Sequence, residues 1–175
     1  KKTSPVLCLG PCEASVGEMA SAYTTFANGG IRCAPLFVTK IEDSHGNVIA
    51  KFQPLMTEVI SEVSSYQMID MLRAVIQGGT GSRLRYAYHL TADMGGKTGT
   101  TNNNADGWFM GITPNLVSGC WVGGEDRDIH FDHTSMGQGA TMALPVWAYY
   151  MQRVYADKRL GYSQSTKFTM PAKFN

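Results

Sequence analysis

Three short strand-like segments follow one another within residues 94–123, and they limit the possible folds more than any other feature of the sequence. The first runs from Met94 to Thr101, the second from Gly107 to Ile112, and the third from Leu116 to Gly123. The last two are separated only by a turn that contains proline and asparagine. Neighbouring parallel strands need a crossover of about a dozen residues or more, so connections this short predict an antiparallel meander.

Two helices are predicted before the meander. In residues 13–30, Ser15 and Glu18 fit a capping box, and two glycines at the end supply a left-handed stop. We expect one side of this helix to face the core, through Val16, Met19, Ala20 and Tyr23. The second helix is predicted over residues 61–77, with Ser61 or Ser64 as its cap. Its core-facing residues would be Ile69, Leu72, Val75 and Ile76.

A hairpin and a third helix complete the expected elements. Residues 36–53 predict two strands joined by a turn at residues 44–47. The third helix is predicted to begin near Thr141, with Pro145 in its first turn. An apolar stripe on it would pack on the meander, formed by Leu144, Trp147, Ala148, Met151 and Val154. The expected fold class is therefore α+β, an antiparallel sheet of at least three strands packed with helices.

The composition is typical of a folded domain and excludes several classes of protein. Hydrophobic residues make up 43% and charged residues 17%, which excludes an intrinsically disordered chain. The formal net charge of +1 lacks the basic excess of a nucleic-acid-binding domain. No apolar run of about 18 residues is present to span a membrane. We expect residues 1–12 to form a partly disordered leader and residues 161–175 to form a polar tail.

Residues 95–101, Gly-Gly-Lys-Thr-Gly-Thr-Thr, are the stretch that most directly indicates chemistry. Strand side chains alternate, so Thr98 and Thr100 should point to the same face, and Gly99 lets a ligand lie against the backbone. An edge strand also offers free N–H and C=O groups to which a peptide can pair. A lysine, Lys97, and two hydroxyls suit a carboxylate. The candidate site is therefore a strand that binds an extended peptide with a terminal carboxylate.

Two other kinds of site are disfavoured. A phosphate-binding loop would need glycine at position 91, where this chain has threonine. Residues 125–133, Glu-Asp-Arg-Asp-Ile-His-Phe-Asp-His, contain possible metal ligands, but we interpret them as a solvated loop. We expect neither a metal nor a cofactor. Asp106 is interpreted as a structural residue of the turn after the motif.

The cysteines and large aromatic residues are assigned structural roles. The four cysteines are Cys8, Cys12, Cys33 and Cys120. They are too few for a disulfide scaffold, and zinc is disfavoured because only Cys8 and Cys12 are close in sequence and no second cysteine pair follows. Their disulfide state stays open. Free buried thiols are the default interpretation. Trp108, Trp121 and Trp147 are expected in the core between the meander and the last helix. Tyr86 and Tyr88 are interpreted as surface or partly buried aromatic residues, with a place at a cleft rim as the alternative.

The order of several short motifs resembles the transpeptidase domain of class A, bifunctional penicillin-binding proteins. The resemblance covers about residues 13–155. It is carried by Glu18–Gly30 (EMASAYTTFANGG), by Lys97-Thr98-Gly99-Thr100, by Trp108-Phe109, by Trp121-Val122-Gly123 and by Ala143–Trp147 (ALPVW). It implies that residues 13–160 are the C-terminal portion of such a domain, with a β-lactamase/transpeptidase-like fold that is incomplete in this chain.

The resemblance also implies an activity, peptidoglycan D,D-transpeptidation through an acyl-serine enzyme that β-lactams inhibit. Lys97 would then supply positive potential, and the hydroxyls of Thr98 and Thr100 would bind the substrate carboxylate. The Thr100 N–H would be an oxyanion donor and Gly99 would have to stay small. The nucleophile motif S-x-x-K and the motif S-x-N are absent, because no serine here has lysine at +3 or asparagine at +2.

Further expectations are implied by the resemblance together with the missing motifs. The nucleophile would lie upstream, the isolated chain would be inactive, and its bared apolar surface would favour self-association. The full-length protein would face the periplasm or cell-wall side and be anchored by a segment absent here. Its partners would be stem peptides ending in D-Ala-D-Ala and β-lactams, with no nucleic acid. The alternatives left open are a D,D-carboxypeptidase, a serine β-lactamase and a non-catalytic peptide- or β-lactam-binding module.

Overall fold

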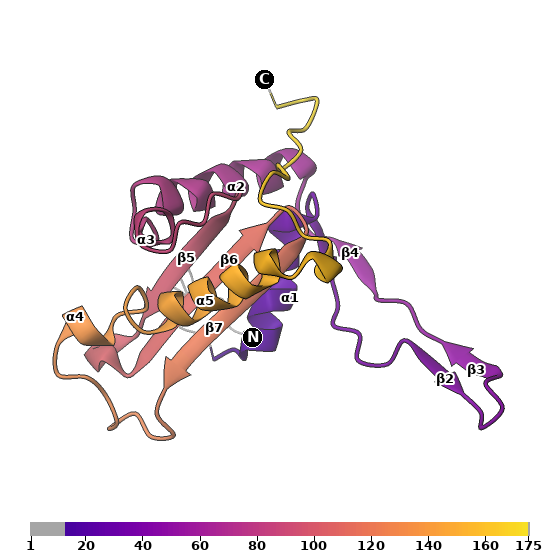
Figure 1. Cartoon of the computed structure of the whole chain (residues 1–175), viewed down its shortest axis with the longest axis horizontal. Helices are drawn as coiled ribbons and strands as arrows, with labels where there is room; N and C mark the ends of the chain where they lie inside the picture. The colour runs from indigo at the N-terminus through magenta and orange to yellow at the C-terminus, as the bar shows by residue number, and fades with distance from the viewer. Residues whose placement is uncertain (1–12, 175) are drawn as a thin grey trace, which may run out of the picture.

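A three-stranded antiparallel sheet forms the centre of the computed structural model, which describes residues 13–174 (Figure 1). The strands are β5 (Gly95–Thr100), β6 (Asp106–Thr113) and β7 (Leu116–Gly123), in the order β5-β6-β7. The predicted meander is therefore confirmed, and so is the α+β class. The motif strand β5 lies at the edge of the sheet. The leader expected over residues 1–12 lies outside the described residues.

Two helices cover opposite faces of this sheet, α1 (Val16–Ala27) and α5 (Ala143–Ala156) (Figure 1). A Cβ added to Gly111 would lie 2.2 Å from the Trp147 ring of α5, which shows how closely α5 approaches β6. A Cβ added to Gly119 of β7 would instead meet Met110 and the α1 residue Val16. Because successive strand residues alternate, odd-numbered residues 107–111 face α5 and even-numbered ones face α1.

The predicted helix caps are present, but the buried side of α1 differs from the expected one. Ser15 and Glu18 form the capping box, and Ser61 caps α2 (Glu62–Gln77). The apolar residues expected to face the core from α1 are only half-buried, whereas its fully buried residues are Ser21 and Thr25. A hydrogen bond helps to explain why a polar residue is buried here. Ser21 Oγ donates to the Cys33 carbonyl, so this side of α1 contacts strand β1 (Ile31–Cys33).

Helix α2 packs against strand β5 at the edge of the sheet. Two further helices, each of one turn, were not predicted. These are α3 (Arg83–Tyr86) and α4 (Thr134–Gly137). Within residues 13–174, the structure holds no helix that is long and apolar enough to cross a membrane. Helix α5 begins two residues after the predicted start and keeps the proline in its first turn.

The predicted hairpin is present but shorter, and it projects from the body of the molecule (Figure 1). Strands β2 (Lys40–Glu42) and β3 (Val48–Lys51) pair with each other. Residues 36–38, predicted as strand, are not in one. A second ladder that we did not predict joins β1 to β4 (Met56–Glu58). Prolines at positions 35 and 54 stand between the two ladders, and proline has no N–H to donate to a ladder.

Two clusters of buried side chains hold the layers together. The larger lies between the sheet and α5, and the expected apolar stripe of that helix supplies Leu144, Trp147, Ala148 and Met151 to it. The smaller joins α2 to the other face of the sheet through Tyr66, Ile69, Leu72, Ile112 and Phe168. Phe168 comes from the segment expected to be a polar tail, so that segment is partly integrated into the core.

An ion pair fixes the C-terminal segment. Arg73 donates from Nε and Nη2 to the two carboxylate oxygens of Asp93, at 2.9 and 2.6 Å, and the Phe168 N–H donates to Asp93 at 3.0 Å. Burial alone would raise the pKa of Asp93, but these hydrogen bonds outweigh it and hold the pKa below its ordinary value. Asp93 is therefore ionised at neutral pH and bridges α2 to the C-terminal segment.

Replacing Asp93 by asparagine should destabilise the chain by about 2–4 kcal/mol, because it leaves the half-buried Arg73 guanidinium with only the exposed Asp70 as a carboxylate partner. The folded-state pKa of Asp93 is lowered, so its contribution is present above the unfolded pKa of about 3.9 and lost as pH falls through the folded value. Urea midpoints at pH 7 and pH 3 measure both effects. Asp157→Asn, which breaks an exposed ion pair with Arg159, is the control and should change little. Equal midpoints for the two variants would contradict the prediction.

Candidate functional site

The backbone of β5 presents two residues of the motif to an open edge. The Thr101 N–H donates to the Asp106 carbonyl, so at that residue the polar groups point toward β6. Backbone groups alternate in direction along an antiparallel pair. The N–H and C=O groups of Thr98 and Thr100 therefore point away from β6, toward the unpaired edge of the sheet. This is the arrangement to which an extended peptide can add as a further strand.

The motif side chains occupy both faces of β5. Thr98 and Thr100 share the α5 face, as predicted: Thr98 lies 2.7 Å from the Thr80 hydroxyl, and Thr100 Oγ1 accepts from the Gly139 N–H at 3.0 Å. Lys97 lies on the α1 face, and its Nζ donates to the Thr98 carbonyl at 2.9 Å. The ammonium thus reaches the strand edge from the α1 face, whereas the two hydroxyls lie on the α5 face.

A groove runs along this strand, and we call it the β5 groove. Its cavity volume is about 1080 Å³. The motif supplies residues 97–101 to it, and the turn and neighbouring strand supply Asn102, Asn103, Ala105, Trp108 and Met110. The opposite wall comes from Glu13, Ala14, Met19 and Tyr23 of α1 and its approach, and the far end from Arg127 and Asp128. The groove brings together all four predicted site residues. The parts of its wall that α1 and Arg127 form were not predicted.

Two glycines shape the strand from opposite sides. A Cβ on Gly99 would point into the groove, 3.1 Å from the Trp108 Cβ. A Cβ on Gly139 would lie 2.3 Å from the Gly99 carbonyl oxygen and 2.4 Å from that of Trp108. Gly139 is therefore the residue that lets the loop before α5 lie on the backbone of β5 and donate to Thr100.

Replacing Gly139 by alanine should destabilise the chain by about 1–3 kcal/mol, because the added methyl overlaps backbone atoms that cannot rotate away. Thermal or urea unfolding measures the change. Gly78→Ala is the matched control, since nothing lies within 4 Å of an added Cβ there, and it should stay within about 0.5 kcal/mol of the parent. A Gly139→Ala protein as stable as the parent would contradict this packing.

Asp106 ties the end of β5 to its surroundings. Its Oδ1 accepts from Trp121 Nε1 at 2.9 Å, and its Oδ2 accepts from the Thr101 hydroxyl at 2.7 Å and from Arg127 Nη2 at 2.9 Å. Burial would raise the pKa of Asp106, but the hydrogen bonds from Thr101, Trp121 and Arg127 outweigh it and lower the pKa. The structural role predicted for Asp106 agrees with these contacts, which also hold Arg127 at the groove.

The aromatic predictions are confirmed for one tryptophan and wrong for two. Trp147 is buried against Phe109 between the sheet and α5. Trp108 and Trp121 are paired on β6 and β7 on the opposite face, and Trp121 is 41% exposed. Even-numbered residues of β6 face α1, so Trp108 contributes to the groove instead of this core. Tyr86 is exposed, as predicted.

The remaining candidates behave as structural residues. Residues 125–133 form an exposed loop, as expected, and no group of metal-ligating side chains gathers within residues 13–174. Cys33 and Cys120 are half-buried free thiols, and burial raises the pKa of Cys120. Cys8 and Cys12 lie outside the described residues.

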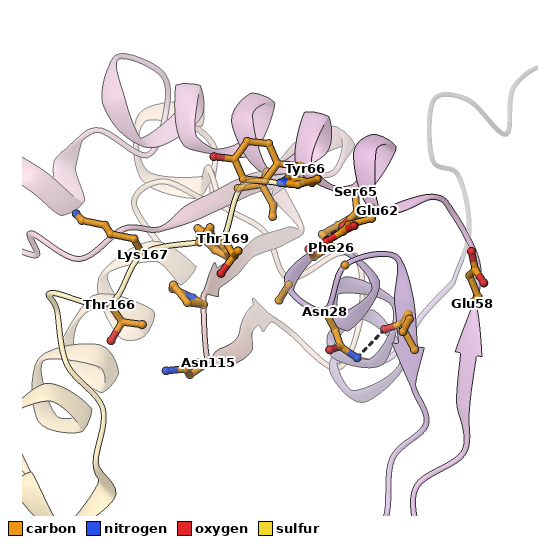
Figure 2. A pocket seen from close by; sticks show the side chains of 17 residues that line it. Phe26, Asn28, Glu58, Glu62, Ser65, Tyr66, Asn115, Thr166, Lys167 and Thr169 are labelled. Atoms are coloured by element: carbon orange, nitrogen blue, oxygen red, sulfur yellow. Dashed lines mark hydrogen bonds between the residues drawn. The ribbon is translucent and has the colours of Figure 1, made fainter. Parts of the chain in front are cut away.

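A second cavity, of about 680 Å³, lies away from the motif, where the end of α1, the start of α2 and the C-terminal segment meet (Figure 2). Figure 2 shows Asn28, Tyr66, Asn115 and Lys167 around it, and the dashed line marks the Asn28 Nδ2 bond to the Ile31 carbonyl. The cavity includes no residue of the β5 strand. We therefore place the candidate site in the β5 groove.

Comparisons with known proteins agree with the motifs. The model of the penicillin binding protein transpeptidase domain matches residues 7–118. Penicillin-binding protein 1A of Aquifex aeolicus is 38% identical over 148 residues, and that of Neisseria lactamica is 38% identical over 156 residues. These matches cover 85% and 83% of this chain but only 20% and 18% of the relatives. The chain spans about a fifth of the length of these curated relatives.

Solved structures give the same result for the fold. The crystal structure of penicillin-binding protein 1A from Haemophilus influenzae superposes with a TM-score of 0.80 at 27% identity, covering 97% of this chain and 30% of that one. The penicillin-binding protein PonA1 from Mycobacterium tuberculosis gives a TM-score of 0.77 at 27% identity, covering 96% and 44%. The resemblance inferred from the motifs is confirmed, and the chain belongs to the penicillin-binding protein transpeptidase domain family.

Proposed function

We propose that this chain forms the substrate-binding part of a peptidoglycan D,D-transpeptidase, an acyltransferase that cross-links cell-wall peptides and is inhibited by β-lactams. The observation that carries the proposal is the open edge of β5, where Lys97, Thr98 and Thr100 meet in one groove. The name of the matched family supports β-lactams as ligands. The names of the relatives, each a penicillin-binding protein 1A, support the same class of enzyme.

In the proposed reaction, the donor stem peptide adds along the edge of β5. Its terminal carboxylate is bound by the hydroxyls of Thr98 and Thr100 in the positive potential of Lys97. The carbonyl of the penultimate D-Ala accepts from the Thr100 N–H, which points to the same edge. Such a preorganised donor lowers a barrier by roughly 3–4 kcal/mol elsewhere. The groove and the open edge support this placement of the peptide.

The covalent steps need a nucleophilic serine, and no serine of this chain lies in an S-x-x-K motif. The serine Oγ attacks the penultimate D-Ala carbonyl carbon, a base takes its proton, and the C–N bond breaks. The terminal D-Ala leaves with a proton on its amine. An amine of a second stem peptide then attacks the ester carbon, forms the new amide and returns the serine hydroxyl. We place this serine elsewhere in the full-length protein, and we propose that the isolated chain does not acylate.

The alternatives differ in what resolves the acyl-enzyme. A D,D-carboxypeptidase would transfer the acyl group to water, and a serine β-lactamase would release an opened β-lactam rapidly. A binding module would form no ester.

The discriminating experiment gives the full-length protein a D-Ala-D-Ala peptide and an amine acceptor and follows the products by mass spectrometry. Released D-Ala with a new amide supports the transpeptidase. Released D-Ala with only a free acid supports the carboxypeptidase, and no release supports the binding module.

We also propose the location and the partners of the full-length protein. A cell-wall substrate places the catalytic domain on the periplasmic or cell-wall side of the membrane, with an anchor in another part of the protein. The half-buried apolar residues of α1 that line the groove, Met19 and Tyr23, support a contact with another part of the domain or with a second copy. Protease protection of the domain in intact spheroplasts would contradict the proposed side of the membrane.

A further inference from the structure

The β5 groove holds a second cation beyond the motif. Among the residues that line it, the positively charged ones are Lys97 and Arg127. Lys97 lies beside the first half of the motif, whereas Arg127 comes from the loop after β7 and lies at the other end of the strand. The groove therefore has one cation at each end of the edge to which a peptide would add.

Hydrogen bonds define how near Arg127 lies to the motif. Its Nη2 and the Thr101 hydroxyl both donate to the same oxygen of Asp106, at 2.9 and 2.7 Å. These two donor atoms are thus no more than about 6 Å apart. Thr101 directly follows Thr100, whose N–H points to the open edge. The guanidinium is therefore held beside Thr101, the residue that follows the oxyanion donor at the C-terminal end of β5.

Arg127 keeps most of its hydrogen-bonding capacity for a ligand. A guanidinium carries five N–H donors, and among residues 13–174 one Arg127 nitrogen is bonded, to Asp106. Its side chain is 73% exposed. Asp106 also accepts from Trp121 and Thr101, so its carboxylate holds the guanidinium in place while dividing its charge among three donors. Asp128 and Glu13 also line the groove. Their negative charges disfavour a ligand anion in the groove except beside Lys97 or Arg127.

The direction of the peptide follows from the proposed function, on which this step rests. The terminal carboxylate lies by Lys97 and the hydroxyls of Thr98 and Thr100, and the scissile carbonyl, one residue earlier in the peptide, lies by the Thr100 N–H. The donor chain must therefore continue past Thr101, antiparallel to β5. The residue that precedes the two D-alanines then lies at the end of the strand where Arg127 is held.

We propose that Arg127 is a specificity residue that binds a free side-chain carboxylate on the donor residue preceding D-Ala-D-Ala. The substrate class is thus a stem peptide with an acidic group at this position, in preference to the same peptide with a carboxamide. A guanidinium forms shorter and stronger hydrogen bonds with a carboxylate than with a neutral carbonyl. We expect the preference to be about tenfold or more in kcat/KM, in the range of hydrogen bonds to charged groups.

The test uses two synthetic donor peptides that differ only in this side chain, carboxylate against carboxamide, and the full-length protein that contains this chain. D-Ala release gives kcat/KM for each. The parent should prefer the acid peptide about tenfold or more, and Arg127→Gln should bring the ratio close to one. Arg127→Lys, which keeps the charge but loses the planar fork, should fall between them. Arg159→Gln changes another exposed arginine, one paired with Asp157 away from the groove, and should keep the parent ratio.

Each other outcome overturns the inference. A parent that releases D-Ala from both peptides at equal rates has no such specificity. A parent preference that Arg127→Gln leaves intact belongs to another residue. A parent that releases D-Ala from neither peptide overturns the proposed function and this inference together, which separates that failure from the first two.

Discussion

Thr100→Val in the full-length protein is expected to slow acylation by penicillin about ten- to a hundredfold. The substitution keeps the shape of the side chain and removes the hydroxyl that we place against the substrate carboxylate, and a hydrogen bond to a charged group is worth about 1.5–3 kcal/mol. The measurement is the second-order rate of adduct formation, followed by mass spectrometry or with a fluorescent penicillin.

The structure also predicts a smaller effect of the same substitution on folding. Thr100 Oγ1 accepts from the N–H of the buried Gly139, so Thr100→Val should cost about 1–2 kcal/mol of stability as well. Thr100→Ser keeps both contacts and is the matched control: it should retain most of the parent's stability and acylation rate. A Thr100→Val protein that acylates at the parent rate would remove the hydroxyl from the site.

Trp147→Ala is expected to destabilise the chain by about 3–5 kcal/mol, the largest stability effect that we predict. Trp147 is 2% exposed, stacks edge-on against Phe109 at 5.0 Å and donates from Nε1 to the Ser118 hydroxyl at 2.8 Å. Its removal leaves a cavity over Gly111, which has no side chain to fill it. A loss this large is a substantial part of the roughly 5–15 kcal/mol by which a typical domain is stable.

Tyr149→Ala provides the control for Trp147→Ala, because Tyr149 is 59% exposed on the same helix. We expect its effect to stay below about 1 kcal/mol. Urea midpoints of both variants and the parent make the comparison. If both alanine variants unfold at the same urea concentration, the packing of α5 on the sheet cannot be as described.

Features encoded locally were predictable from the sequence. The capping box at Ser15 and the serine cap at Ser61 act within one turn, and the periods of the apolar residues identify the strands and α5. The ladder between β1 and β4 was missed because its two strands are short and separated by the projecting hairpin. Nothing in the sequence next to β1 identifies a partner that lies beyond that hairpin.

The site was predictable as a strand but not as a groove. The motif gave Lys97, Thr98, Gly99 and Thr100, because alternation and an edge position are properties of one segment. The sequence shows that Trp108 and Phe109 face opposite ways, but not which face α5 covers, and so Trp108 was assigned to the wrong layer. Arg127 reaches the groove only through its bond to Asp106, a contact between residues 21 positions apart. Such a pairing depends on the register of β6 and β7, which the sequence alone does not provide.

The most direct test of the central claim is the intact mass of the full-length protein after incubation with penicillin, beside its Lys97→Ala variant. The proposal predicts one covalent adduct per parent molecule, formed much more slowly when the Lys97 ammonium is absent. A folded parent that gains no mass, or a Lys97→Ala protein that forms the adduct as fast as the parent, would contradict the claim that the β5 edge is the substrate-binding strand of an acylating enzyme.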